Sequence, residues 1–156
     1  MTAIVVRVLF FLLACIVVPG AASAQRTLDG SRRAWEECQA KQNASPAFLA
    51  LRHKIGSRAS PDIAFSMDKA TPEEVQNLRI LLREYIIPCG RFATEVARAR
   101  LPAIVPFLKV SQAKADANYE RLIAGEINWG QFIRDARAID AELDAEISRH
   151  DSDAQK

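Results

Sequence analysis

Apolar residues recur alternately three and four positions apart through residues 71–100, and this spacing predicts one long amphipathic helix. Thr71 is suited to cap it, a proline follows at the first helical position, and Glu74 stands three residues after the cap, as in a capping box. Pro88 has no backbone N–H and crowds the carbonyl four residues before it, so we expect a kink there. The apolar face comprises Val75, Leu78, Leu82, Tyr85, Cys89, Phe92 and Val96.

Two shorter helices are expected before this one. After a loose start at residues 25–28, the first begins at a cap formed by Ser31 or Asp29 and ends near Asn43. The second begins at Pro46 and ends before Gly56, because proline suits a first helical position and glycine commonly follows the last.

Two further helices are expected after the long one, over residues 102–124 and 128–150. Two prolines four positions apart should make the first turn of the earlier helix irregular. The link at residues 125–128 is so short that the two helices must pack antiparallel, with Trp129 covering the junction. The fold class is therefore all-α: a bundle of about four to five helices with a long kinked central helix and a C-terminal antiparallel hairpin.

Periodicity fails between residues 57 and 70. Ile63, Phe65 and Met67 alternate with other residues there, which is consistent with a short extended piece or with one helical turn packed over the core. Connections without regular structure are often functional. These three residues are therefore a candidate surface for a ligand or partner.

Residues 1–24 have the composition of a cleaved secretory signal: a basic residue at Arg7, an apolar run over 8–18, and small residues before a cut after Ala24. The apolar run is shorter than the roughly 20 residues of a spanning helix, so a retained anchor is a minor alternative. Lipidation at Cys15 is another, although the residues after it stay apolar. We expect a periplasmic or secreted protein with one helical domain over residues 25–150 and a disordered tail at 151–156.

Cleavage would leave two cysteines, Cys38 and Cys89. In an oxidising compartment, an even pair in a small exported domain is most simply a disulfide, and one intramolecular pairing is available. Trp35 is three residues from Cys38 and thus on the same helical face, so we expect its indole to pack in the core beside the disulfide.

Charge gives a mild polarity along the chain. Residues 25–60 hold seven basic and three acidic side chains, whereas residues 101–156 hold seven basic and ten acidic ones. This distribution falls short of the clustered Lys and Arg footprint of a nucleic-acid-binding protein, so no nucleic-acid partner is expected.

No recognisable reactive site emerges, and we expect no metal, no cofactor and no enzymatic activity. His53 and His150 have no metal-ligand spacing with each other or with the cysteines. No Gly-x-Ser-x-Gly elbow occurs. Gly125 and Gly130 are expected to serve the hairpin rather than to cradle a phosphate. Two acidic pairs lie four residues apart on the last helix, where a solvated face explains them: Asp140 with Asp144, and Glu142 with Glu146.

Several short motifs together resemble small exported helical proteins of Gram-negative bacteria that have no assigned activity. The motifs are Trp35-x-x-Cys38, Thr71-Pro72-Glu73-Glu74, Pro88-Cys89 and Leu122-x-x-Gly125-x-Ile127-x-Trp129-Gly130. The resemblance implies a bacterial envelope protein, and it supplies no catalytic residues.

The leading functional hypothesis is a non-enzymatic interaction protein that binds another envelope protein without stable membrane insertion. The alternative is a carrier of an apolar small molecule in the bundle core, suggested by polar Ser111 and Gln112 on an otherwise apolar helical face. A continuous cavity beside Ser111 would favour the carrier. An envelope hydrolase without a visible motif is the third hypothesis.

Overall fold

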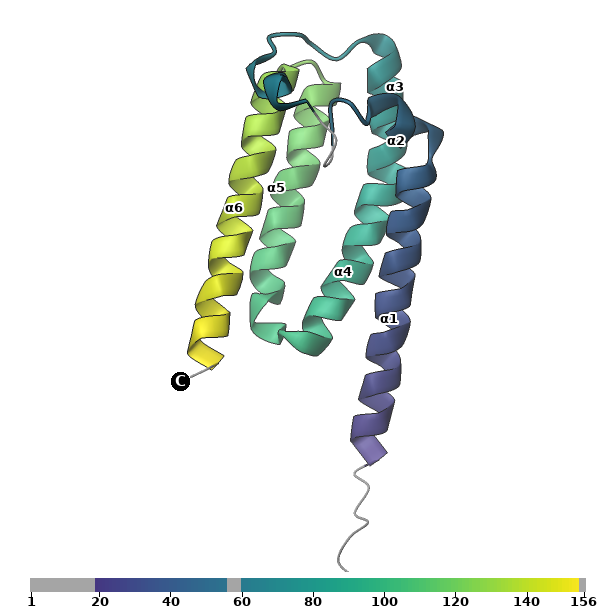
Figure 1. Cartoon of the computed structure of the whole chain (residues 1–156), viewed down its shortest axis with the longest axis vertical. Helices are drawn as coiled ribbons and strands as arrows, with labels where there is room; N and C mark the ends of the chain where they lie inside the picture. The colour runs from purple at the N-terminus through teal and green to yellow at the C-terminus, as the bar shows by residue number, and fades with distance from the viewer. Residues whose placement is uncertain (1–18, 56–59, 155–156) are drawn as a thin grey trace, which may run out of the picture.

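The computed structural model describes the backbone of residues 19–55 and 60–154, and the side chains of residues 28–55 and 60–150. This part of the chain is helical with no strand, and it forms the expected disulfide-stapled bundle (Figure 1). The helices are α1 (Pro19–Ala44), α2 (Pro46–Leu51), α3 (Pro72–Ile80), α4 (Ile87–Arg100), α5 (Val105–Ile123) and α6 (Trp129–Ala154).

Helix α1 begins earlier than expected. It is helical from Pro19 and passes without a break through residues 25–28, so the loose start expected there is wrong. Alanine has the highest helix propensity of all residues, and three alanines lie between Pro19 and Gln25. The helix continues across the expected cleavage position, and residues 1–18 of the expected signal lie outside the described residues.

The short helix α2 has the expected start and an earlier end. Ser45 caps it, since its Oγ accepts a hydrogen bond from Phe48 N at 3.1 Å. The helix stops at Leu51, where the N–H of Lys54 bonds to the Leu51 carbonyl in a tighter turn that brings Ile55 into the core. Gly56, the expected end, lies outside the described residues.

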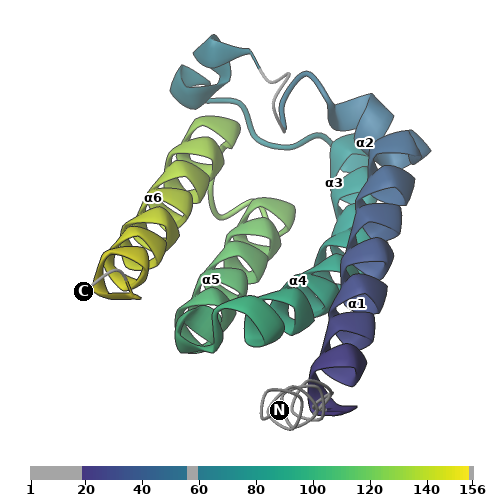
Figure 2. The ribbon, with the colours of Figure 1, turned by 60° about the horizontal axis from the view of Figure 1, so that its bottom comes forward.

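The long helix has its predicted capping box and an irregular middle. The Thr71 hydroxyl accepts from Glu74 N, and the Glu74 carboxylate accepts from Thr71 N. Between α3 and α4, the segment Leu81–Ile86 is a π-helix, and Ile87 N bonds to Leu82 O. This wider turn accommodates Pro88, which cannot continue a normal α-helical ladder. Figures 1 and 2 show the helix changing direction here, as the expected kink requires.

The C-terminal hairpin is confirmed. A 3-10 turn at Pro102–Ile104 precedes α5, in agreement with the irregular start expected from the two prolines. Gly125 ends α5 with φ +72°, and the N–H groups of Gly125 and Glu126 bond back to Leu122 O and Arg121 O in a Schellman motif. Helix α6 then returns antiparallel to α5 (Figure 1) and continues to Ala154, into the segment expected to be a disordered tail.

The hydrophobic core is concentrated at one end of the bundle, where α2, α3 and the start of α6 meet. Trp129 is fully buried there, as expected. Trp35 remains 37% exposed at the other end, so its expected packing in the core is wrong. Its side chain lines a hollow together with small residues such as Ala93 and Ala97. The core cluster comprises Ala47, Leu51, Ile55, Ala64, Leu78, Leu81, Leu122, Ile127, Trp129, Phe132 and Ile133.

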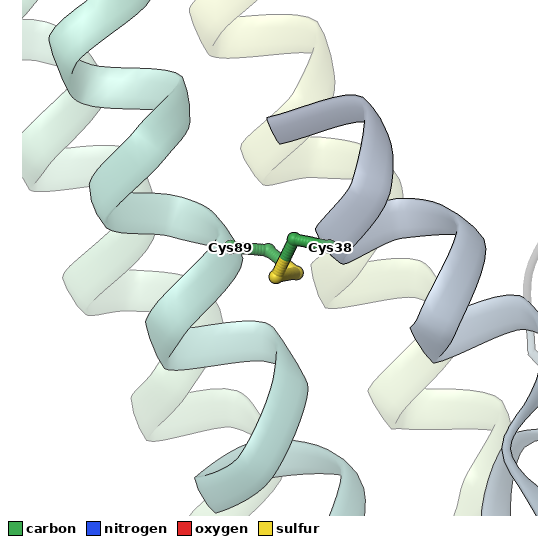
Figure 3. The surroundings of a disulfide bond; sticks show 2 residues. All are labelled: Cys38 and Cys89. Carbon is green, nitrogen blue, oxygen red and sulfur yellow. A yellow bond between two sulfur atoms is a disulfide. The ribbon is translucent and has the colours of Figure 1, made fainter. Parts of the chain in front are cut away.

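The disulfide joins α1 to α4, as predicted (Figure 3). The Cα atoms of Cys38 and Cys89 are 5.6 Å apart, within the range that a disulfide spans without backbone movement. In Figures 1 and 2, α4 and α5 lie between α1 and α6. The bond therefore attaches α1, one of the two outer helices, to the rest of the bundle.

Replacing both cysteines by serine should lower the free energy of unfolding by roughly 2–5 kcal/mol, because the unfolded chain regains the entropy of a closed loop. Urea denaturation of the oxidised protein and of the double variant measures this difference. Equal midpoints and equal slopes would contradict it.

Candidate partner-binding loop at the start of helix α6

Residues 60–70 cross the end of the bundle at which α6 begins (Figure 1). Pro61–Phe65 form a 3-10 turn that contains Ile63 and Phe65, whereas Met67 follows it in a stretch without regular structure. Ala64 is buried and Ile63 packs against the core, whereas Phe65 is 81% exposed and Met67 78% exposed. The loop therefore anchors one set of side chains and presents two large apolar ones.

The loop is attached to α6 through the N–H groups of the helix's first turn. A helix start leaves N–H groups without intrahelical partners. Here Trp129 N donates to Asp68 O at 2.9 Å, and Gly130 N donates to Ser66 O at 3.0 Å. Gln131 N donates to Asn128 Oδ1 at 2.8 Å, so Asn128 caps the helix. Two of the three bonds come from the loop, so satisfying the helix start also fixes the loop backbone.

The absence of a side chain at Gly130 allows the loop backbone to approach the first turn of α6. A Cβ atom built at this position would lie 2.9 Å from Ala64 O and closer still to Ser66 O. The glycine therefore serves the contact between α6 and the loop, in addition to its place beside the hairpin. Nothing in the local spacing indicates this role, because the two carbonyls are more than 60 residues earlier in the chain.

Side chains add further attachments to the loop. Lys69 Nζ donates to Gly125 O at 2.7 Å, so the loop is tied to the α5–α6 turn. Arg134 Nη1 donates to Ala64 O at 2.5 Å. The Phe65 side chain is exposed, but the carbonyls of the residues on either side of it, Ala64 and Ser66, both accept hydrogen bonds from α6. The exposed side chains are thus carried by a fixed segment.

A cluster of polar contacts centred on the Glu74 carboxylate lies next to the loop and joins three segments of the chain. Glu74 Oε2 accepts from Trp129 Nε1 at 3.2 Å and from Thr71 N at 2.9 Å. Glu74 Oε1 pairs with Lys54 Nζ at 2.5 Å, and the ammonium lies 4.9 Å from the centroid of the Trp129 ring. The capping-box glutamate therefore connects the chain after α2, the start of α3 and the start of α6.

Glu74 is mostly buried, and its pKa reflects opposing effects. Burial is the largest effect and raises the pKa of the carboxyl. The hydrogen bonds from Lys54, Thr71 and Trp129, together with the Lys54 charge, outweigh it, and the pKa lies below the ordinary 4.5. The carboxylate is therefore the form that the fold stabilises.

Ser111 and Gln112 lie on α5, away from the loop, so the structure does not bring them together with the other candidate binding residues, Ile63, Phe65 and Met67. Gln112 bridges α4 and α5: its Nε2 donates to Gly90 O at 2.8 Å, and its Oε1 accepts from the Thr94 hydroxyl at 3.2 Å. Ser111 lines an open hollow of about 400 Å³ between α5 and α6. A carrier would favour an enclosed cavity beside Ser111, whereas this hollow is open to the surface.

The remaining candidates for chemistry are dispersed. His53 is exposed, and the His150 ring lies 5.6 Å from that of Phe107. Glu142 and Glu146 pair with Lys114 and Arg149 respectively. Among the described residues, no three His, Cys, Asp or Glu side chains gather closely enough to hold a metal ion.

Comparison of the chain with known protein families, with curated proteins and with solved structures finds no match. Within the parts of the chain that the structure describes, every helix is too short or too polar to cross a membrane.

Gly130→Ala should destabilise the protein by about 1–3 kcal/mol, because the added methyl group overpacks the contact with the loop. Gly30→Ala is the matched control: it lies in α1 with no atom within 4 Å of the added Cβ, and it should stabilise by about 0.5–1 kcal/mol through helix propensity. Urea unfolding measures both. A neutral Gly130→Ala would show that the loop does not pack as described.

Because of Glu74, the free energy of unfolding should depend on pH in the acid range. Since its folded-state pKa is below its ordinary value, the stabilisation is present above that value and is lost as pH falls towards the folded pKa. Urea unfolding between about pH 5 and about pH 3 should therefore show a shallower loss of stability for Glu74→Gln than for the unmodified protein. Parallel pH profiles would contradict the cluster's role.

Proposed function

We propose that this protein is a non-enzymatic helical interaction protein of the bacterial envelope, and that it contacts its partner through Phe65 and Met67. The observation that carries the proposal is the exposure of these two side chains, 81% and 78%, on a backbone fixed to α6 by hydrogen bonds. Other large apolar side chains among the described residues are less exposed, the next being Val110 at 56%.

A fixed loop is suited to binding because its ordering entropy has already been lost on folding. Association then loses less conformational freedom, so more of the interaction energy remains as affinity. An aromatic side chain entering a pocket of the partner is a common energetic anchor. Methionine adds an adaptable apolar surface next to it.

The proposed location rests on the N-terminal sequence and the disulfide. Residues 1–24 have the features of an export signal. The Cys38–Cys89 bond is compatible with an oxidising compartment such as the periplasm or the exterior. The resemblance to small exported helical proteins supports the same location, and another envelope protein is the corresponding partner.

A carrier of an apolar small molecule is the second candidate, and one observation favours it. A hollow of about 460 Å³ opens between α1, α4 and α6, within the roughly 300–1,000 Å³ of small-molecule sites. Its lining is apolar apart from Arg100, and it is open to the surface rather than enclosed. The lining residues are Trp35, Ala93, Val96, Ala97, Arg100, Leu101, Ile104 and Ile147.

Site-specific photocrosslinking in intact bacteria tests the leading proposal. A benzoylphenylalanine placed at position 65 should yield a discrete protein adduct, and the same residue at position 49 should not. Leu49 is a matched control because it is apolar and 47% exposed on α2. Adding Met67→Ser should reduce the adduct while changing stability by less than about 0.5 kcal/mol. No adduct at 65, or equal adducts at both positions, would contradict the proposal.

A further inference from the structure

The hollow beside Trp35 presents an apolar surface that the fold leaves uncovered. Its volume is about 460 Å³. Ile104 in its lining is buried, whereas Trp35 is 37% exposed, so the hollow reaches from the surface to the edge of the buried residues. The other apolar side chains of the lining come from α4, from the turn between α4 and α5, and from α6. An apolar group placed in the hollow would remove this surface from water.

The open side of the hollow carries positive charge. Arg100, the last residue of α4, is exposed and is the charged residue among those that line the hollow. Its guanidinium makes no hydrogen bond or ion pair with any described residue. The hollow therefore combines apolar walls with a cation that has no carboxylate partner in the described part of the chain.

The chain around Arg100 extends this charge. Residues 96–115, from the last turns of α4 to the middle of α5, contain four basic residues and no acidic one. The four are Arg98, Arg100, Lys109 and Lys114. Among the described residues, Lys114 alone of these has a carboxylate partner, Glu142. The same residues supply most of the apolar lining, so apolar surface and uncompensated positive charge lie together.

We propose that this hollow binds a single-chain anionic amphiphile, an alkyl carboxylate of medium length. Its chain would contact Trp35, Val96 and Ile147, and its carboxylate would pair with Arg100, whose planar guanidinium matches a carboxylate. An engineered cavity of about 150 Å³ holds the six carbons of benzene in another protein, so 460 Å³ admits a chain of about ten carbons. The assignment rests on the carrier function, the second candidate above, and specifies its ligand.

Acrylamide quenching of tryptophan fluorescence measures binding at this hollow, because Trp35 is partly exposed and Trp129 is fully buried. The purified protein is titrated with octanoate, decanoate and octylammonium below their micelle concentrations. We expect octanoate to protect Trp35 at a concentration about fivefold lower than octylammonium does, as for one exposed ion pair. Decanoate should bind roughly tenfold more tightly than octanoate, because two more methylenes leave water.

Three results of this titration would overturn the assignment. Equal affinities for octanoate and octylammonium would contradict the anionic ligand and leave the carrier function standing. No protection of Trp35 by decanoate up to millimolar concentration would contradict both. Protection by phosphatidylglycerol vesicles without protection by decanoate would assign the charge to a membrane surface instead.

Arg100→Gln tests the role of the charge. The variant should lose the preference for octanoate over octylammonium, and an unchanged preference would overturn the assignment. Arg79→Gln is the matched control, because it removes the same charge from an exposed position on α3, outside the hollow, and it should retain the preference. A circular-dichroism melt of each variant reports folding separately.

Ala97→Phe tests the position of the alkyl chain, since the added ring would fill part of the hollow that Ala97 lines. Equilibrium dialysis with labelled decanoate should show at least a tenfold loss of affinity. Ala99→Phe is the matched control, an exposed alanine two residues along the same helix that does not line the hollow, and it should bind normally. Equal binding by the two folded variants would overturn the assignment.

Discussion

The arrangement of this bundle depends on how the first turn of α6 obtains hydrogen-bond partners. Its N–H groups face the loop rather than water, and Asp68 and Ser66 supply the carbonyls. Since a buried N–H without a partner is costly, the loop and the helix start stabilise each other. Gly130 allows the necessary approach, and the Glu74 carboxylate holds Trp129 against α3 on the other side. One constraint thus positions α6, closes the core and fixes the exposed Phe65.

The other end of the bundle is organised differently. Few large side chains are fully buried there, and Trp35 is only partly covered. Two specific connections hold the helices together here. One is the disulfide between α1 and α4, and the other is the Gln112 amide, which bridges α4 and α5. Covalent and polar contacts therefore hold the helices where apolar packing is sparse. This open end is also where the hollow beside Trp35 is found.

Features determined by residues three to five apart could be predicted from the sequence. The capping box at Thr71, the glycine end of α5 and the Asn128 cap are of this kind. The disulfide could be predicted for a different reason, because Cys38 and Cys89 are the two cysteines that remain after the expected signal cleavage. Non-covalent interactions between distant segments could not be predicted, because spacing carries no information about them. The link from Glu74 to Trp129, the clearance at Gly130 and the exposure of Trp35 depend on how helices meet. At Pro88 the sequence predicted an interruption, but it did not indicate that this would be a π-helix over Leu81–Ile86.

Native-state hydrogen exchange at the Trp129 and Gly130 amides tests the central claim most directly. Both amides are at a helix start, where N–H groups without partners exchange rapidly. If the loop carbonyls of Asp68 and Ser66 hold them, both should be protected to about the same degree as the amides in the middle of α6. Exchange at the rate of an unstructured chain at these two positions, with the middle of α6 still protected, would show that the loop is not fixed to the helix.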